Sequence, residues 1–131
     1  MASLIISTGL ATEFSKIFNV FNTFSILAII FLIAIMTSFL TEFTSNTATT
    51  FLMLPLLSIY ALNNNLDVLQ LTLPFVLAAS CAFMMPIATP PNAIVYSGDK
   101  FKVSFMVSNG FFINIISVII ISFYVFFFNN F

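Results

Sequence analysis

Charged residues are nearly absent from this sequence. Of its 131 residues, three are lysine or arginine and four are aspartate or glutamate, so that 5% carry charge, whereas a soluble domain averages about 25%. Hydrophobic residues account for 61% of the chain. A soluble or disordered protein needs far more polar surface, and a nucleic-acid-binding protein needs a basic face. The composition therefore predicts an integral membrane protein that binds no nucleic acid.

Histidine is also absent, and Cys81 is the single cysteine. Without histidine the chain has no imidazole for general-base catalysis or for a zinc site, and one cysteine forms no intrachain disulfide. No other group suits covalent or acid–base catalysis, so we expect a protein that is not an enzyme and holds no transition metal. The N-terminal MASLIISTGL contains no basic residue, so we do not expect it to be a cleaved signal peptide.

Four apolar stretches divide the chain. Phe24–Phe43 is long enough to span the ~30 Å hydrocarbon layer as a helix, whereas Phe51–Leu62 is too short at ~1.5 Å per residue. The third stretch begins near Leu69 and continues to Tyr96. The fourth, from about Phe105 to Phe128, is the least interrupted. Polar loops are expected between stretches, at Asn63–Asp67 and Ser97–Lys102.

Two polar breaks interrupt these stretches. The first is TSNTATT at residues 44–50, where Ser45 and Asn46 are good N-cap residues and predict a helix that begins beside them. The second is ATPPN at residues 88–92, whose two prolines remove backbone donors and favour an extended Thr89. Unwound backbone at membrane depth is stable only inside protein or beside a hydrated cavity. Such interrupted segments are typical of the binding site of a transporter.

The same breaks also have structural explanations. Hydroxyl side chains are common where transmembrane helices pack, TSNTATT is compatible with a surface turn, and the prolines are compatible with kinks. As a binding site, neutral oxygens suit an alkali cation, and hydroxyls, amides and a helix N-terminus suit an anion. Glu42 is the one charge inside the first stretch, and an acid within the membrane is a functional candidate by default. We favour a structural role in which Glu42 ties the polar tip down by a hydrogen bond.

Two blocks of sequence resemble a known transporter family. They are TEFTSNTATTFLMLPL at Thr41–Leu56 and SCAFMMPIATPPNAIVYSGDK at Ser80–Lys100. In this order and in so apolar a chain, they resemble the C-terminal part of the divalent anion:sodium symporter (DASS) family. The resemblance covers nearly the whole chain. It implies a carrier that moves di- and tricarboxylates, or sulfate in some branches, together with sodium.

The resemblance implies an all-α integral membrane fold that forms part of one inverted repeat. Family members are several times longer and carry another Ser-Asn-Thr hairpin in an N-terminal repeat, so we expect residues 1–131 to be a C-terminal fragment of a transmembrane domain. The implied elements are a re-entrant helical hairpin over residues 24–62 with its tip at Ser45–Thr47, one broken transmembrane helix made of Leu69–Pro86 and Pro90–Tyr96, and a last transmembrane helix over Phe105–Phe128.

The resemblance also assigns a binding site to the two breaks. The coupling ion is sodium, and no other cofactor is implied. Asn46 is expected to serve both the ion and a substrate carboxylate. The implied sodium ligands, largely backbone carbonyls, are Thr41, Thr44, Asn46 and Ala88. The implied substrate contacts are Ser45, Asn46 and Thr47, with Thr89 and Pro90 as the opposite wall.

Two functions from different classes remain open. The first is the substrate- and sodium-binding part of a secondary transporter for di- or tricarboxylates such as succinate, malate or citrate. This multi-pass protein of the plasma (inner) membrane would be completed by the missing N-terminal repeat and, at full length, by a homodimer partner. The second is a truncated remnant or a small membrane protein without transport activity of its own. A carboxylate exchanger or a sulfate carrier of the same family would show the same features.

Overall fold

The computed structural model describes residues 24–98 and 102–128. All regular structure in this part of the chain is α-helical, as the sequence predicts. The N-terminal decapeptide and the middle of the Ser97–Lys102 loop lie outside the described residues. The helices are α3 (Ile26–Thr41), α4 (Asn46–Asn63), α5 (Val68–Ala79), α6 (Pro90–Ser97) and α7 (Val103–Phe128).

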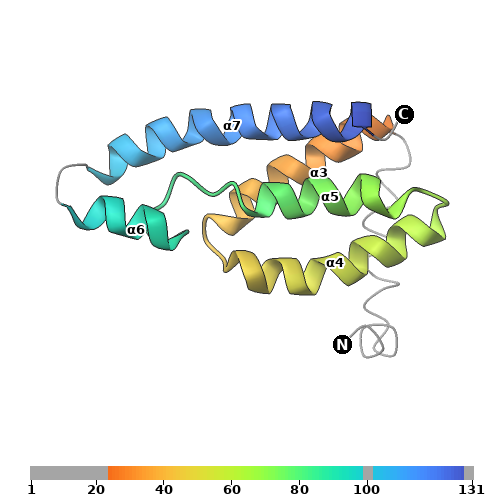
Figure 1. Ribbon diagram of the computed structural model, residues 1–131, viewed down its shortest axis with the longest axis horizontal. Helices are drawn as coiled ribbons and strands as arrows, with labels where there is room; N and C mark the ends of the chain where they lie inside the picture. Colours follow the sequence, from red (N-terminus) through yellow and green to blue (C-terminus); the bar gives the residue numbers. More distant parts are fainter. Residues whose placement is uncertain (1–23, 99–101, 129–131) are drawn as a thin grey trace.

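The α5 helix is the centre of the arrangement (Figure 1). The chain reverses after α3, and α4 runs back from that turn. The α5 helix contacts α3, α4 and α7, and α3 also contacts α7. The two arms of the hairpin are therefore bridged by α5, and α7 covers α3 and α5 from another side. The helical hairpin at residues 24–62 is present, while its re-entrant path through a membrane remains a prediction.

Side-chain oxygens cap the starts of the first four described helices. Ser45 accepts a hydrogen bond from the Ala48 N–H at 3.3 Å, which fixes the start of α4 where the sequence predicted it. The α4 helix is longer than the apolar stretch Phe51–Leu62, because the polar residues before it form the first turns of the helix. The other capping residues are Ser25 for α3, Asp67 for α5 and Thr89 for α6.

Two apolar clusters hold the helices together. Small side chains such as Ala34 and Ala78 are fully buried and let helices approach closely, which is the usual packing of helices in membranes. One cluster joins α3, α4 and α5 through Ile29, Ile33, Leu57, Tyr60, Ala61, Leu71 and Phe75. The other joins α3, α5 and α7 through Ile30, Ala34, Ala78, Val118, Ile121 and Val125.

Within the described residues, α7 is the one helix that is long and apolar enough to cross a membrane, with 26 residues. The first apolar stretch gives a shorter helix than expected, because Ser25 caps α3 at its start and the chain turns after Thr41. At ~1.5 Å per residue, the 16 residues of α3 extend about 24 Å, less than the ~30 Å hydrocarbon thickness.

The third apolar stretch differs most from the expectation. The helix predicted over Leu69–Pro86 ends at Ala79, and residues Ser80–Thr89, here called the 80–89 segment, connect α5 to α6 without forming a helix. Thr89 has φ −141° and ψ 152°, the extended backbone that a following proline favours. Pro90 and Pro91 begin α6, where missing N–H groups cost no helical hydrogen bond.

Candidate functional site

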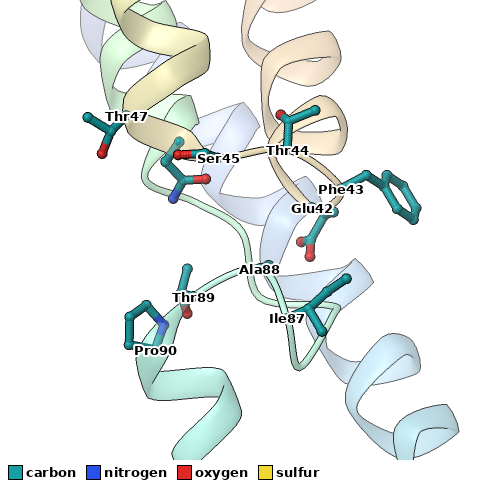
Figure 2. A pocket seen from close by; sticks show the side chains of 10 residues that line it. Glu42, Phe43, Thr44, Ser45, Thr47, Ile87, Ala88, Thr89 and Pro90 are labelled. Carbon is teal, nitrogen blue, oxygen red and sulfur yellow. The ribbon is translucent and has the colours of Figure 1, made fainter.

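The two polar breaks of the sequence meet at one pocket. The turn after α3 and the start of α4 face the end of the 80–89 segment across a cavity of about 440 Å³. Figure 2 shows the turn residues on one side and Ile87–Pro90 on the other. The lining residues are Glu42, Phe43, Thr44, Ser45, Asn46, Thr47, Ile87, Ala88, Thr89 and Pro90.

Most of the predicted site residues line this pocket. They include all the predicted substrate contacts and three of the four predicted sodium ligands. Thr41 is the exception. It is fully buried, and its hydroxyl donates within α3 to the carbonyls of Thr37 at 3.0 Å and Ser38 at 3.1 Å. The Thr41 hydroxyl proton is therefore used within α3, and the binding roles themselves stay predictions.

The hydroxyls of the turn are partly engaged in local structure. Thr44 donates to the Leu40 carbonyl at 2.9 Å, and its oxygen lies 2.9 Å from the Thr49 hydroxyl. Ser45 accepts from the Ala48 N–H as the cap of α4. These bonds hold the turn in one shape and leave the first N–H groups of α4 directed toward the pocket end of the helix, as at any helix N-terminus.

Asn46 carries an unusual atom at the pocket. Its Oδ1 is buried and has no hydrogen-bond partner, and no other buried side-chain oxygen or nitrogen shares this property among the described residues. Leaving a buried acceptor unsatisfied costs about 1–3 kcal/mol. A cation, a water molecule or a donor group of a ligand at the pocket would remove that cost.

The opposite wall contributes a second free acceptor. Pro90 and Pro91 have no N–H group, and the Asn92 N–H donates to the Thr89 hydroxyl at 3.4 Å. In the described part of the chain, the carbonyl of Ala88 consequently accepts no hydrogen bond. Ala88 and Asn46 both line this pocket, so the two residues that carry these oxygens face each other across it.

Glu42 joins the hairpin to the 80–89 segment. Its Oε1 accepts from the Met84 N–H at 2.9 Å and its Oε2 from the Met85 N–H at 2.8 Å. The Oε1 also accepts from the Nδ2 of Asn114 in α7 at 2.7 Å. Glu42 is 1% exposed. The structural role favoured for this acid is therefore confirmed, since its bonds tie the hairpin tip to the facing wall.

Side chains from other helices bond four further backbone groups of the 80–89 segment. Asn114 Oδ1 accepts from the Phe83 N–H at 3.3 Å, and Ser38 donates to the Cys81 carbonyl at 2.8 Å. Asn92 Nδ2 donates to the carbonyls of Ala82 at 2.9 Å and Met85 at 3.0 Å. These bonds replace helical ones, which explains why α5 ends at Ala79 rather than at Pro86.

Gly110 brings α7 close to the same segment. A Cβ atom at this position would lie 2.6 Å from the carbonyl carbon of Phe83 and 2.7 Å from the Cα of Met84. Only glycine leaves room for backbone at this distance. Sequence reasoning missed Ser38, Asn92, Gly110 and Asn114. The one available signal was an asparagine within a long apolar run, since polar groups there are costly.

Comparison with known proteins gives a consistent result. The family model described as "Sodium:sulfate symporter transmembrane region" matches residues 1–130. The sodium-dependent dicarboxylate transporter SdcS of Staphylococcus saprophyticus is 45% identical over 89 residues, which cover 68% of this chain and 17% of that protein. SdcS of Staphylococcus aureus is 46% identical over 81 residues, which cover 62% and 16%.

An uncharacterized transporter of Haemophilus influenzae is also similar. It is 46% identical over 84 residues, which cover 64% of this chain and 18% of that protein. The matched part of this chain thus covers less than a fifth of the length of these relatives. With a family model that matches almost every residue, the chain belongs to the sodium:sulfate symporter family, the divalent anion:sodium symporters that its two polar blocks resemble.

Proposed function

We propose that this chain supplies the C-terminal binding hairpin of a secondary transporter that couples sodium to a di- or tricarboxylate. The function is transport rather than catalysis. Two of the similar proteins are named sodium-dependent dicarboxylate transporters, which supports sodium as the coupling ion and a carboxylate as the substrate.

The observation that carries the proposal is the pair of unpaired oxygens at the pocket. Within residues 24–98 and 102–128, no group donates a hydrogen bond to Asn46 Oδ1 or to the Ala88 carbonyl, and both residues line the cavity. Oxygen ligands from unwound backbone are what sodium sites in broken-helix transporters use. Sodium bound here would be held by Asn46 and Ala88, with further oxygens from Thr41 and Thr44.

The anion would bind on the hairpin side of the pocket. The α4 helix begins there with N–H groups and the positive end of its dipole. The α6 helix begins with two prolines and offers no such donors. Ser45, Asn46 and Thr47 would therefore donate to a substrate carboxylate, with Thr89 and Pro90 as the facing wall. Among the residues that the structure describes, no lysine or arginine lines the pocket, so bound sodium would supply the positive charge, and its departure would release the anion.

The same proposal covers the membrane arrangement. Residues 24–62 would enter and leave the membrane from one side, residues 69–96 would be a broken transmembrane helix, and residues 105–128 would be the last transmembrane helix. The protein would be a multi-pass protein of the plasma (inner) membrane. An N-terminal repeat would complete the site, and two copies would form a homodimer.

The proposal is tested by Asn46→Ala in the transporter that contains this chain, reconstituted in liposomes. We expect sodium-driven succinate uptake to be abolished while insertion is unchanged, because one amide serves both ligands. Asn109→Ala is the matched control, since Asn109 is exposed and bonds the Phe105 carbonyl of its own helix. Wild-type uptake by Asn46→Ala would remove the Ser-Asn-Thr turn from the site.

A second measurement separates a transporter part from a complete carrier. In liposomes that contain the 131-residue chain by itself, we expect no sodium-dependent accumulation of succinate, because the chain carries one Ser-Asn-Thr turn. Robust uptake there would show that a single hairpin suffices. Failure of uptake in every longer context as well would favour a remnant without transport activity.

A further inference from the structure

Asn114 lies in the middle of α7, outside the pocket, and is completely buried. Both ends of its amide are used. The Nδ2 donates to Glu42 Oε1 at 2.7 Å, and the Oδ1 accepts from the Phe83 N–H at 3.3 Å. The side chain therefore connects α7 to the end of α3 and to the 80–89 segment at the same time.

Glu42 and Asn114 act as one acceptor surface for the 80–89 segment. Together they accept from three consecutive N–H groups, those of Phe83, Met84 and Met85. In a helix these donors would bond to carbonyls of the preceding turn. Asn114 orients the Glu42 carboxylate by donating to the same oxygen that accepts from Met84. Without Asn114, Glu42 Oε1 would lose one of its two donors, and the Phe83 N–H would lose its acceptor.

We infer that Asn114 is a positioning residue for the sodium site. Through Glu42 it fixes the path of the 80–89 segment and so keeps Ala88 opposite Asn46. The inference rests on the proposed sodium site and assigns a role to α7, which contributes no residue to the pocket lining.

The packing of α7 supports this role. Gly110 lies one helical turn before Asn114, and its lack of a side chain lets the Phe83–Met84 backbone touch the helix. Gly110 and Asn114 are both buried on the same face of α7. The segment is therefore held against α7 at two points, by backbone contact at Gly110 and by the hydrogen bond from the Phe83 N–H to Asn114. Any displacement of α7 relative to α3 would stretch the bond between Asn114 and Glu42.

The natural Cys81 gives a direct readout of this segment in the chain as it exists. It is the single cysteine, it is partly buried, and its carbonyl accepts from Ser38. The 131-residue chain would be placed in phosphatidylcholine nanodiscs, and the rate of Cys81 alkylation by N-ethylmaleimide would be measured as NaCl replaces KCl at constant ionic strength. Because sodium would join Ala88 to Asn46, we expect sodium to slow alkylation in the wild type.

In Asn114→Leu we expect two changes. Alkylation without sodium should be about tenfold faster, the factor for a loss of about 1.4 kcal/mol. The sodium concentration for half-maximal protection should rise by at least a similar factor, a change that a role in folding alone would not produce. Asn109→Leu on the exposed side of the same helix should change neither value, since its amide bonds within α7. Asn114→Ser, with a smaller side chain, should raise both the alkylation rate without sodium and the sodium concentration for half-maximal protection. This variant replaces Asn114→Leu in the test if circular dichroism shows the leucine variant to be unfolded.

The outcomes distinguish the two proposals. If sodium does not protect Cys81 in the wild type, the proposed sodium site itself is contradicted. If sodium protects the wild type and the folded Asn114 variants need the same sodium concentration, only the positioning role is overturned, even if their alkylation is faster. The inference is supported if the Asn114 variants need more sodium for half-maximal protection of Cys81 while Asn109→Leu needs the same concentration as the wild type.

Discussion

Replacing Glu42 by glutamine removes one of the two acceptor oxygens that hold the 80–89 segment. The amide oxygen can still accept from the Met84 N–H and Asn114, but the amide nitrogen then faces the Met85 N–H, which now bonds to Oε2 at 2.8 Å. A hydrogen bond to a charged group contributes about 1.5–3 kcal/mol, and a buried donor left without a partner costs about 1–3 kcal/mol. Because these contributions overlap, we expect the segment to be destabilised by roughly 2–4 kcal/mol.

Amide hydrogen exchange measures this change locally. A loss of roughly 2–4 kcal/mol corresponds to exchange that is about 30- to 700-fold faster at residues 83–85. The chain would be reconstituted in nanodiscs, and a peptide that covers these residues would be followed by mass spectrometry. Asp67→Asn is the matched control, because Asp67 is exposed and asparagine can still cap α5 by accepting from the Leu69 N–H.

The reasoning would be refuted by exchange at residues 83–85 that is unchanged in Glu42→Gln. That result would mean that the hydrogen bonds from the Met84 and Met85 N–H groups to Glu42 do not hold the segment in the membrane-embedded protein. Equal acceleration along the whole chain would also contradict it, because the structure assigns the effect of Glu42 to one segment. Acceleration confined to the 80–89 segment is the expected pattern.

Three further predictions follow from the same contacts. Gly110→Ala should destabilise the chain by about 1–3 kcal/mol in a thermal unfolding assay, because its Cβ would overlap the Phe83–Met84 backbone. Gly98→Ala is the control and should be tolerated, because its Cβ would lie 3.6 Å from the nearest atom. Equal stability of the two variants would argue against the close approach of α7 to the 80–89 segment. Replacing Pro90 and Pro91 together by alanine should restore two backbone N–H donors and let the Ala88 carbonyl accept a helical hydrogen bond. Apparent sodium affinity in uptake assays should then fall more than the amount of folded transporter does. Unchanged sodium dependence would contradict this prediction. Ser45→Ala should cost about 1 kcal/mol through loss of the α4 cap, seen as faster amide exchange in the first turn of α4, and exchange equal to that of the wild type would mean that the cap is not formed.

Local chemistry made several features predictable from the sequence. The scarcity of charge indicated a membrane protein, because few polar side chains are available for a water-exposed surface. Ser45 predicted the start of α4 through its capping oxygen, and the X-Pro bond at Thr89 predicted extended backbone. Each of these follows from one residue and its neighbours in the chain. The two polar breaks also predicted most of the pocket lining, since unwound polar backbone in an apolar chain has to meet protein or water.

The end of α5 and the wall of the pocket depend on tertiary structure. The sequence after Ala79 is apolar and compatible with helix as far as Pro86, yet the chain leaves the helix because Glu42, Asn114, Ser38 and Asn92 take over its backbone hydrogen bonds. Glu42 and Asn114 are 72 residues apart in the chain. A helical hydrogen bond and a side-chain hydrogen bond satisfy a backbone group about equally well, so local preference does not choose between them. The choice is made where α3, α5 and α7 pack together, and only the fold brings those side chains to the 80–89 segment.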